Sequence, residues 1–148
     1  MPIDDEYDLR RFVDAQRESY ARARAELSTG RKTSHWMWFV FPQLSGLGRS
    51  PMAERYAISS LGEAKAYLAH AVLGARLEEC AALVNAVEGK SLQEIFGSPD
   101  DLKFRSSMTL FAHAAPPASV FREALDKYCG GEEDPLTLAL LNPRARDV

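Results

Sequence analysis

A repeated helix-start signal constrains this chain more than any other feature of its sequence. A serine or aspartate able to cap a helix stands at five places, three of them directly before proline: Ser50, Ser60, Ser91, Ser98 and Asp134. Such residues accept hydrogen bonds from the first helical turn, and proline is favoured at the first helical position. Ser60 and Ser91 are also followed three residues later by glutamate, as in a capping box. We therefore expect at least five helices and no sheet of more than two short strands.

Apolar residues at spacings of three and four mark the longer helices. One such stripe runs from Leu9 to Leu27 and is closed by Gly30, another covers residues 72–87, and a third covers residues 120–128. The fold class predicted is all-α, a single irregular helical domain over residues 1–148 with an ordered core at about 8–141 and a frayed tail at 142–148. The residues expected in the core are Leu77, Cys80, Leu83, Val84, Leu110, Phe111 and Phe121.

Composition narrows the class of protein. The 148 residues are 46% hydrophobic and carry a net charge of -3, as expected of a small soluble globular protein without broad nucleic-acid binding. No apolar run reaches the length of a membrane span, and the absence of a signal peptide favours the cytoplasm. We expect no disulfide between Cys80 and Cys129. We also expect no metal or cofactor, because His35, His70 and His113 lack ligand spacing.

The segment from Arg31 to Leu44 is the first candidate site. Its basic start is followed by six bulky apolar residues, with Ser34 as a helix cap and Pro42 as a stop, which favours a short buried helix. A helix N-terminus with cations and tryptophans suits an anionic or nucleotide-like ligand. The residues expected to bind it are Arg31, Lys32, Ser34, His35, Trp36, Trp38 and Gln43. The alternative is that most of these aromatic residues are core and that His35 only bonds a carbonyl.

The second candidate site is the start of the helix after Pro99. Its charged residues are Asp100, Asp101, Lys103 and Arg105, and they are followed inside the helix by the hydroxyl side chains of Ser106, Ser107 and Thr109. Hydroxyls disfavour a helix interior unless they bond something, so this face is expected to extend the first pocket. The alternative reading is local: Ser98 caps the helix, Asp101 completes the capping box, and the hydroxyls bond carbonyls one turn earlier.

Two classes of function remain open. The first is a domain that binds a small anionic ligand, with enzymatic activity unassigned; any acid–base chemistry would fall first to His35 and then to Asp101. The second is a noncatalytic protein-interaction module in which Trp36, Trp38 or Pro42 form an exposed aromatic patch. Concave, polar-lined tryptophans favour the ligand, whereas a flat exposed patch favours the protein partner.

Several short segments are distinctive together: Gly30-Arg31-Lys32, Ser34-His35-Trp36-Met37-Trp38-Phe39, Phe41-Pro42-Gln43-Leu44, Gly46-Leu47-Gly48, Tyr56-Ala57-Ile58, Pro99-Asp100-Asp101-Leu102-Lys103 and Ser106-Ser107-Met108-Thr109-Leu110-Phe111. With these segments the chain resembles a bacterial domain family of unknown function whose members are often labelled calpastatin-like. The resemblance extends from about Leu9 to Leu141 and implies a mainly helical single domain. It implies no activity, and nothing here resembles the repetitive calpain inhibitor of animals. The chain departs from the family pattern at Phe104 and Ala71, where leucine and proline are common.

Overall fold

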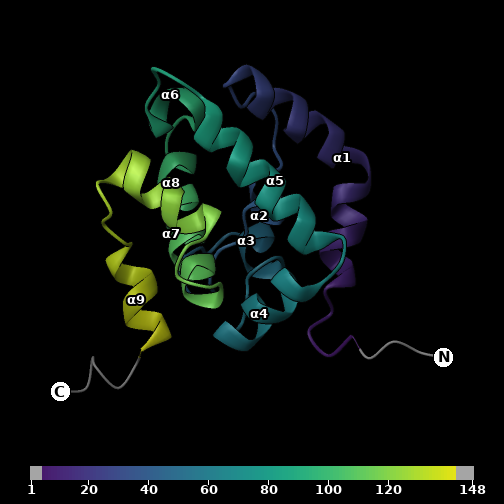
Figure 1. Ribbon diagram of the computed structural model, residues 1–148. Helices are drawn as coiled ribbons and strands as arrows, with labels where there is room; N and C mark the ends of the chain where they lie inside the picture. Colours follow the sequence, from purple (N-terminus) through teal and green to yellow (C-terminus); the bar gives the residue numbers. More distant parts are fainter. Residues whose placement is uncertain (1–4, 143–148) are drawn as a thin grey trace.

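The computed structural model describes residues 5–142 and confirms the all-α fold (Figure 1). The nine helices of this range are α1 (Arg10–Thr29), α2 (Met37–Val40), α3 (Pro51–Arg55), α4 (Leu61–Ala69), α5 (Leu73–Ala86), α6 (Leu92–Phe96), α7 (Asp100–Ala114), α8 (Val120–Cys129) and α9 (Pro135–Leu141). The described chain contains no strand, only an isolated parallel bridge between Leu44 and Ile58. Most of the predicted tail, residues 143–148, lies outside the described residues.

Four of the five predicted helix starts are confirmed. The side chains of Ser50, Ser60, Ser91 and Asp134 each accept a backbone N–H from the first turn of α3, α4, α6 and α9. At Ser91 the capping box is complete, because the carboxylate of Glu94 accepts the Ser91 N–H at 2.9 Å. Each cap removes an unpaired donor from a helix of only five to nine residues, where end effects weigh most.

The predicted cap at Ser98 is wrong. α7 begins at Asp100, with Pro99 at the N-cap position and no side-chain cap. Backbone carbonyls replace the side chain, because Gly97 accepts the Asp101 N–H at 2.9 Å and Pro99 accepts the next N–H groups. The side chain of Asp101 therefore takes no part in a capping box.

α7 is largely buried and contacts four other helices, α4, α6, α8 and α9. Apart from Arg105, every residue from 104 to 112 is buried, which explains why polar and apolar residues alternate there without a clear stripe. Most of the predicted core is confirmed by the buried side chains of Leu77, Cys80, Val84, Leu110, Phe111 and Phe121. Leu83 is the exception, because it is only partly buried against the core.

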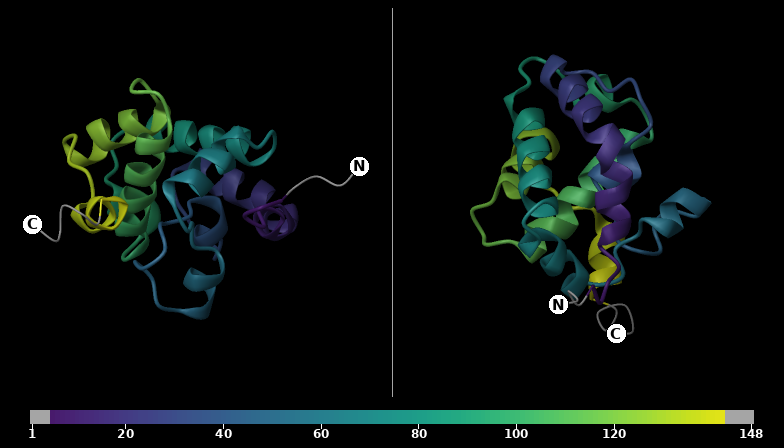
Figure 2. Two further views of the ribbon diagram at one scale, coloured as in Figure 1. Left: turned by 90° about the horizontal axis from the view of Figure 1, so that it is seen from below. Right: turned by 90° about the vertical axis from the view of Figure 1, so that its right-hand side faces the viewer.

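α3 and the loop before it stand out from the helical body (Figure 2, right). None of the α3 residues is buried. α1 ends as predicted at Gly30, whose left-handed φ of 78° is a conformation that glycine adopts without strain. Across residues 5–142, no helix combines the length and apolar character needed to cross a membrane.

Candidate functional site

The chain after α1 folds around the carboxylate of Glu26. Its Oε1 accepts the backbone N–H groups of Thr33 at 2.7 Å and Ser34 at 3.0 Å, and the indole N–H of Trp36 at 2.9 Å. The hydroxyl of Ser34 donates to Oε2. We call Glu26 and residues 33–36 the Glu26 turn. Convergent backbone and side-chain donors of this kind form an anion site, and here the anion belongs to the chain itself.

The environment of Glu26 strongly favours the ionised form of its carboxyl over the neutral form. Burial raises the pKa of its carboxyl, but the hydrogen bonds from Ser34, Thr33 and Trp36 outweigh burial and lower the pKa from 4.5 to about 2. The carboxyl is therefore ionised at neutral pH and holds the turn closed.

The predicted cap at Ser34 is wrong because α2 begins later in the chain. α2 begins at Met37, the N-cap position is taken by Trp36, and no side chain caps the helix. Ser34 lies two residues before the N-cap position, and its hydroxyl donates to Glu26. The predicted short buried helix is present, but its four residues give it little of the N-terminal dipole expected of a longer helix.

Asp100 lies between two lysines that the sequence assigns to different candidate sites. The Nζ of Lys32 is 2.8 Å from its Oδ2, and the Nζ of Lys103 is 3.5 Å from its Oδ1. The Lys32 side chain is only 8% exposed, whereas that of Lys103 is 28% exposed. Each ammonium also faces an indole ring, Lys32 at 5.2 Å from the centroid of Trp36 and Lys103 at 5.7 Å from that of Trp38.

A small cavity lies beside Trp38. Its wall includes the side chains of Trp38, Gln43 and Lys103 together with the apolar groups of Met37, Phe41 and Leu44. We call it the Trp38 cavity. Its volume is about 10 Å³, which is roughly the space of one water molecule. The structure thus brings three of the ten predicted ligand-binding residues to one concave, partly polar surface.

The other predicted residues lie elsewhere. Asp101 and Arg105, one turn apart on α7, line an open groove of about 440 Å³ beside α6 and α8, not the Trp38 cavity. The guanidinium of Arg105 donates to the carbonyls of Glu132 and Glu133 at 3.2 and 2.9 Å. Arg31 and His35 are exposed, and neither lines the Trp38 cavity. The two candidate sites therefore meet at Lys103, which lines the Trp38 cavity, and at Asp100, which pairs with Lys32.

Two of the three hydroxyls inside α7 bond carbonyls one turn earlier, as the alternative interpretation of the second candidate site expects. Ser106 and Thr109 donate to the carbonyls one turn earlier at 3.1 and 2.9 Å. Ser107 is fully buried, and its Oγ has no hydrogen-bond partner among the described residues. Asp134 accepts a further bond from Ser106, which ties the start of α9 to α7.

The aromatic patch of the alternative hypothesis is wrong for two of its three residues. Trp36 is 1% exposed and Pro42 is buried, so neither can present a flat surface to a protein partner. Only Trp38 is partly exposed, and it adjoins a concave wall.

The two cysteines are not activated as nucleophiles. Burial raises the pKa of the Cys80 thiol to about 12, and burial also raises that of Cys129. A thiol with a raised pKa is a poor nucleophile at neutral pH. Residues 5–142 hold no group of three or more histidine, cysteine, aspartate or glutamate side chains arranged to bind a metal ion.

Comparison with known proteins assigns the family. The model of a family described as "Protein of unknown function (DUF1810)" matches residues 6–141, nearly the whole chain. The chain belongs to this family. The DUF1810 chain also resembles the crystal structure of the conserved hypothetical protein Rv1873 from Mycobacterium tuberculosis, with 60% identity, a TM-score of 0.91, and coverage of 93% of this chain and 98% of that one. A comparison with curated proteins finds no match.

Sequence reasoning missed Glu26, which organises the turn after α1 of this DUF1810 protein, and it placed Asp100 in the second candidate site without its partner Lys32. Glu26 was one of many charges on an amphipathic helix, and only its place one turn before Gly30 signals that it can reach the following loop. Asp100 stood beside Asp101 in a helix start, where either acid suits the helix dipole. Helical spacing separates them, because Asp100 shares a face with Lys103 at i+3 and Asp101 shares one with Arg105 at i+4.

Proposed function

We propose that this DUF1810 protein binds a small anionic ligand carrying a planar ring at the Trp38 cavity. The proposal is carried by one observation: the ammonium of Lys103 lies 5.7 Å from the ring centroid of the half-buried Trp38, at a cavity that Gln43 also lines. A cation, an aromatic face and an amide at one concave surface are the groups that hold an anionic head and a flat ring.

The charges around the cavity favour a ligand with a single negative group. Lys32 and Lys103 share the carboxylate of Asp100, so this cluster keeps one unit of positive charge. Lys32 is nearly buried, which leaves Lys103 as the cation that a ligand reaches. An aromatic carboxylate matches that charge, whereas the phosphates of a nucleoside triphosphate bring more negative charge than the cluster balances.

The Glu26 turn supports placing the ligand at Trp38. Four donors that would bind an external anion near Ser34 already bind Glu26, and displacing an ionised carboxylate from them would cost its hydrogen bonds. The proposal assigns no reaction, because the acid–base candidates His35 and Asp101 do not line the Trp38 cavity.

Matched ligand pairs test the proposal. Benzoate and adenosine monophosphate are compared with neutral benzamide and adenosine, by thermal melting and calorimetry of the purified protein. A ligand that binds only the folded state raises the melting temperature, so we expect benzoate to stabilise the protein more than benzamide does. Lys103→Met and Trp38→Ala should remove the response, and Lys65→Met, at an exposed residue of α4, should keep it. Equal responses to benzoate and benzamide, or a full response in Lys103→Met, would show that the assignment is wrong.

A further inference from the structure

The segment Gly46–Glu54 is a loop followed by most of α3, and it is attached at both ends to the body. Before it, the Ser45 N–H donates to the carbonyl of Ile58 at 2.8 Å. After it, the carbonyl of Arg55 accepts the Nε of Arg11 at 2.8 Å. Both ends thus meet fixed partners, and we call Gly46–Glu54 the flap.

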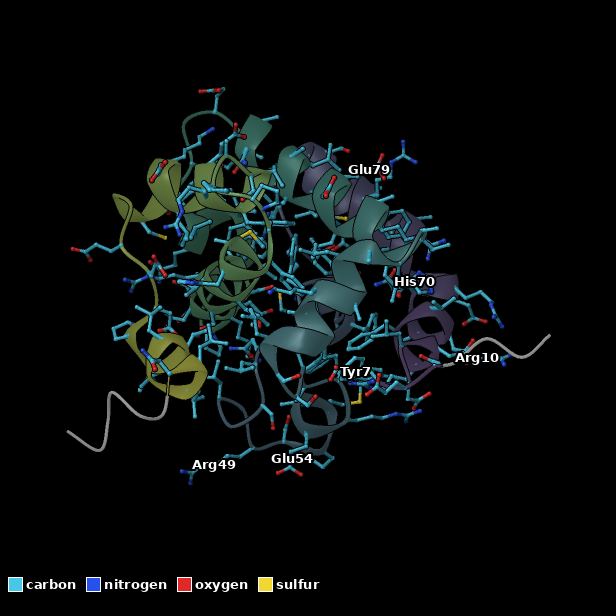
Figure 3. The ribbon with its side chains drawn as sticks, turned by 60° about the horizontal axis from the view of Figure 1, so that its bottom comes forward. Tyr7, Arg10, Arg49, Glu54, His70 and Glu79 are labelled. Atoms are coloured by element: carbon cyan, nitrogen blue, oxygen red, sulfur yellow. The ribbon has the colours of Figure 1, made fainter. Side chains whose placement is uncertain are left out.

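Few interactions hold the flap between these ends. In the described chain, its hydrogen bonds stay within the segment or reach Tyr56 and Ala57 just beyond it. Arg49 and Glu54 are exposed and point away from the body (Figure 3). α3 stands clear of the other helices (Figure 2, right). Leu47 and Met52 are the hydrophobic flap residues that pack, partly buried, against the core of the described chain. Segments with so few buried contacts open at low free energy.

The flap also forms one wall of the Trp38 cavity. Gly48 and Ala53 line the cavity from the flap, together with Trp38 and Lys103 from the body. With that wall in place the cavity holds about one water molecule, so a ring-sized ligand enters only if the wall moves. The body side is less free to move, because Met37 and Phe41 are buried in the core.

α9 contacts the flap at Gly46. The Cδ atoms of Leu140 lie 3.4 and 3.5 Å from the position that a Cβ on Gly46 would occupy. α9 is in turn fixed to α7, because the Asp134 carboxylate accepts the Ser106 hydroxyl and the Asp134 N–H donates to Thr109. A side chain on a fixed helix therefore rests on Gly46, at the start of the flap.

We propose that Gly46–Glu54 is a movable flap over the Trp38 cavity and that Leu140 of α9 is the latch that keeps it shut. The proposal rests on the proposed function for its ligand, but access to Trp38 is measurable without any ligand. Opening the flap exposes the Trp38 ring and Lys103, and closing it buries an aromatic ligand between the flap and the indole.

Leu140→Ala tests the latch, with Leu136→Ala as its control. Leu136 is on the same helix but 67% exposed, so its loss leaves the flap untouched. Two readouts are used on the whole protein: hydrogen exchange of residues 46–54, and quenching of tryptophan fluorescence by iodide. Trp36 is 1% exposed, so iodide reports on Trp38. We expect both to rise about fivefold in Leu140→Ala, since losing a leucine contact shifts a local opening equilibrium by about that factor.

A second variant changes the contact between Leu140 and Gly46 on the flap side. Gly46 has a φ of +101°, so Gly46→Ala strains the backbone and adds a methyl group against Leu140. It should raise both readouts as Leu140→Ala does, which keeps the test valid if one variant folds poorly. Unchanged exchange and quenching in both variants would show that Leu140 does not hold the flap shut. Faster exchange without greater quenching would show that the flap does not control access to Trp38. If both readouts rise but benzoate never binds, the flap stands and the proposed function fails.

Discussion

The Glu26 turn and the Trp38 cavity carry the same kinds of side chain but use them differently. Each region places an indole beside groups that attract a negative charge. The two indoles belong to Trp36 and Trp38, which are only two residues apart in the sequence. In the turn, Glu26 saturates the donors of Thr33, Ser34 and Trp36. At the cavity, Asp100 satisfies Lys32 closely at 2.8 Å and Lys103 loosely at 3.5 Å.

The comparison teaches that an anion-binding pattern identifies a need for negative charge, not its source. Where an acid of the chain reaches all the donors, the pattern is structural. Where the acid is shared between two cations, one positive charge is left for a ligand. The predictions below change one acid or one cation at a time to separate these two cases.

The largest effect on stability is expected from Asp100→Asn. It leaves the nearly buried ammonium of Lys32 without its carboxylate, and breaking a buried ion pair costs about 3 kcal/mol of unfolding free energy. The double variant Lys32→Met with Asp100→Asn removes the stranded charge and should recover most of that loss in urea denaturation. The affinity for benzoate should rise in the single variant, because both lysines are then unshared. A loss below about 1 kcal/mol would show that the pair is effectively solvated.

Glu26→Ala should cost somewhat less, about 2 kcal/mol, because the donors of the turn lose their acceptor and water can replace it in part. It should also convert the structural turn into an anion site. Formate added to this variant should restore melting temperature by occupying the vacated position, whereas formate should have no such effect on Glu18→Ala, an exposed site on α1. Equal formate responses in the two variants would mean that the turn does not act as an anion site.

The pH dependence of stability tests whether the charge of Glu26 stabilises the turn. The pKa of Glu26 is about 2 in the folded protein and about 4.5 when unfolded, so the unfolded chain binds protons first as pH falls. Its stabilisation is therefore complete above about pH 5 and is lost as pH approaches about 2. The stability difference between the wild type and Glu26→Gln should shrink over that range in denaturation at several pH values. A constant difference would contradict the role of the charge.

Lys103→Met should have the smallest effect on stability, below about 1 kcal/mol, because its pair with Asp100 is partly exposed and 3.5 Å long. Its effect on benzoate binding should nevertheless be the largest of the set. A variant that binds normally but is strongly destabilised would reverse the comparison and make Lys103 the structural cation.

The helical framework was predictable because its signals are local. The caps at Ser50, Ser91 and Asp134 act within four residues, and the stripe of α1 ends at the glycine that closes it. The predicted cap at Ser98 was wrong because backbone carbonyls accept the N–H groups at the start of α7. The preference of serine for N-cap positions gives no information about whether such carbonyls are available.

The site was predictable only in part, because its geometry depends on residues distant in the sequence. Lys32 and Lys103 meet at one carboxylate although 71 positions separate them, and no local pattern reports that meeting. The sequence identified the tryptophans and the lysines. It could not show that Glu26 fills the turn, or that Arg105 donates to two carbonyls of the loop between α8 and α9.

The most direct test of this account is a two-dimensional NMR titration of the labelled protein with benzoate. The account predicts chemical-shift changes at the Trp38 indole N–H, the Gln43 side-chain amide and the Lys103 backbone, with the Trp36 indole N–H and the Ser34 amide unmoved. Benzamide should leave all of these signals in place. Shifts centred on Trp36 and Ser34, or no shifts at saturating benzoate, would contradict the claim that the Trp38 cavity takes the ligand while the Glu26 turn is closed.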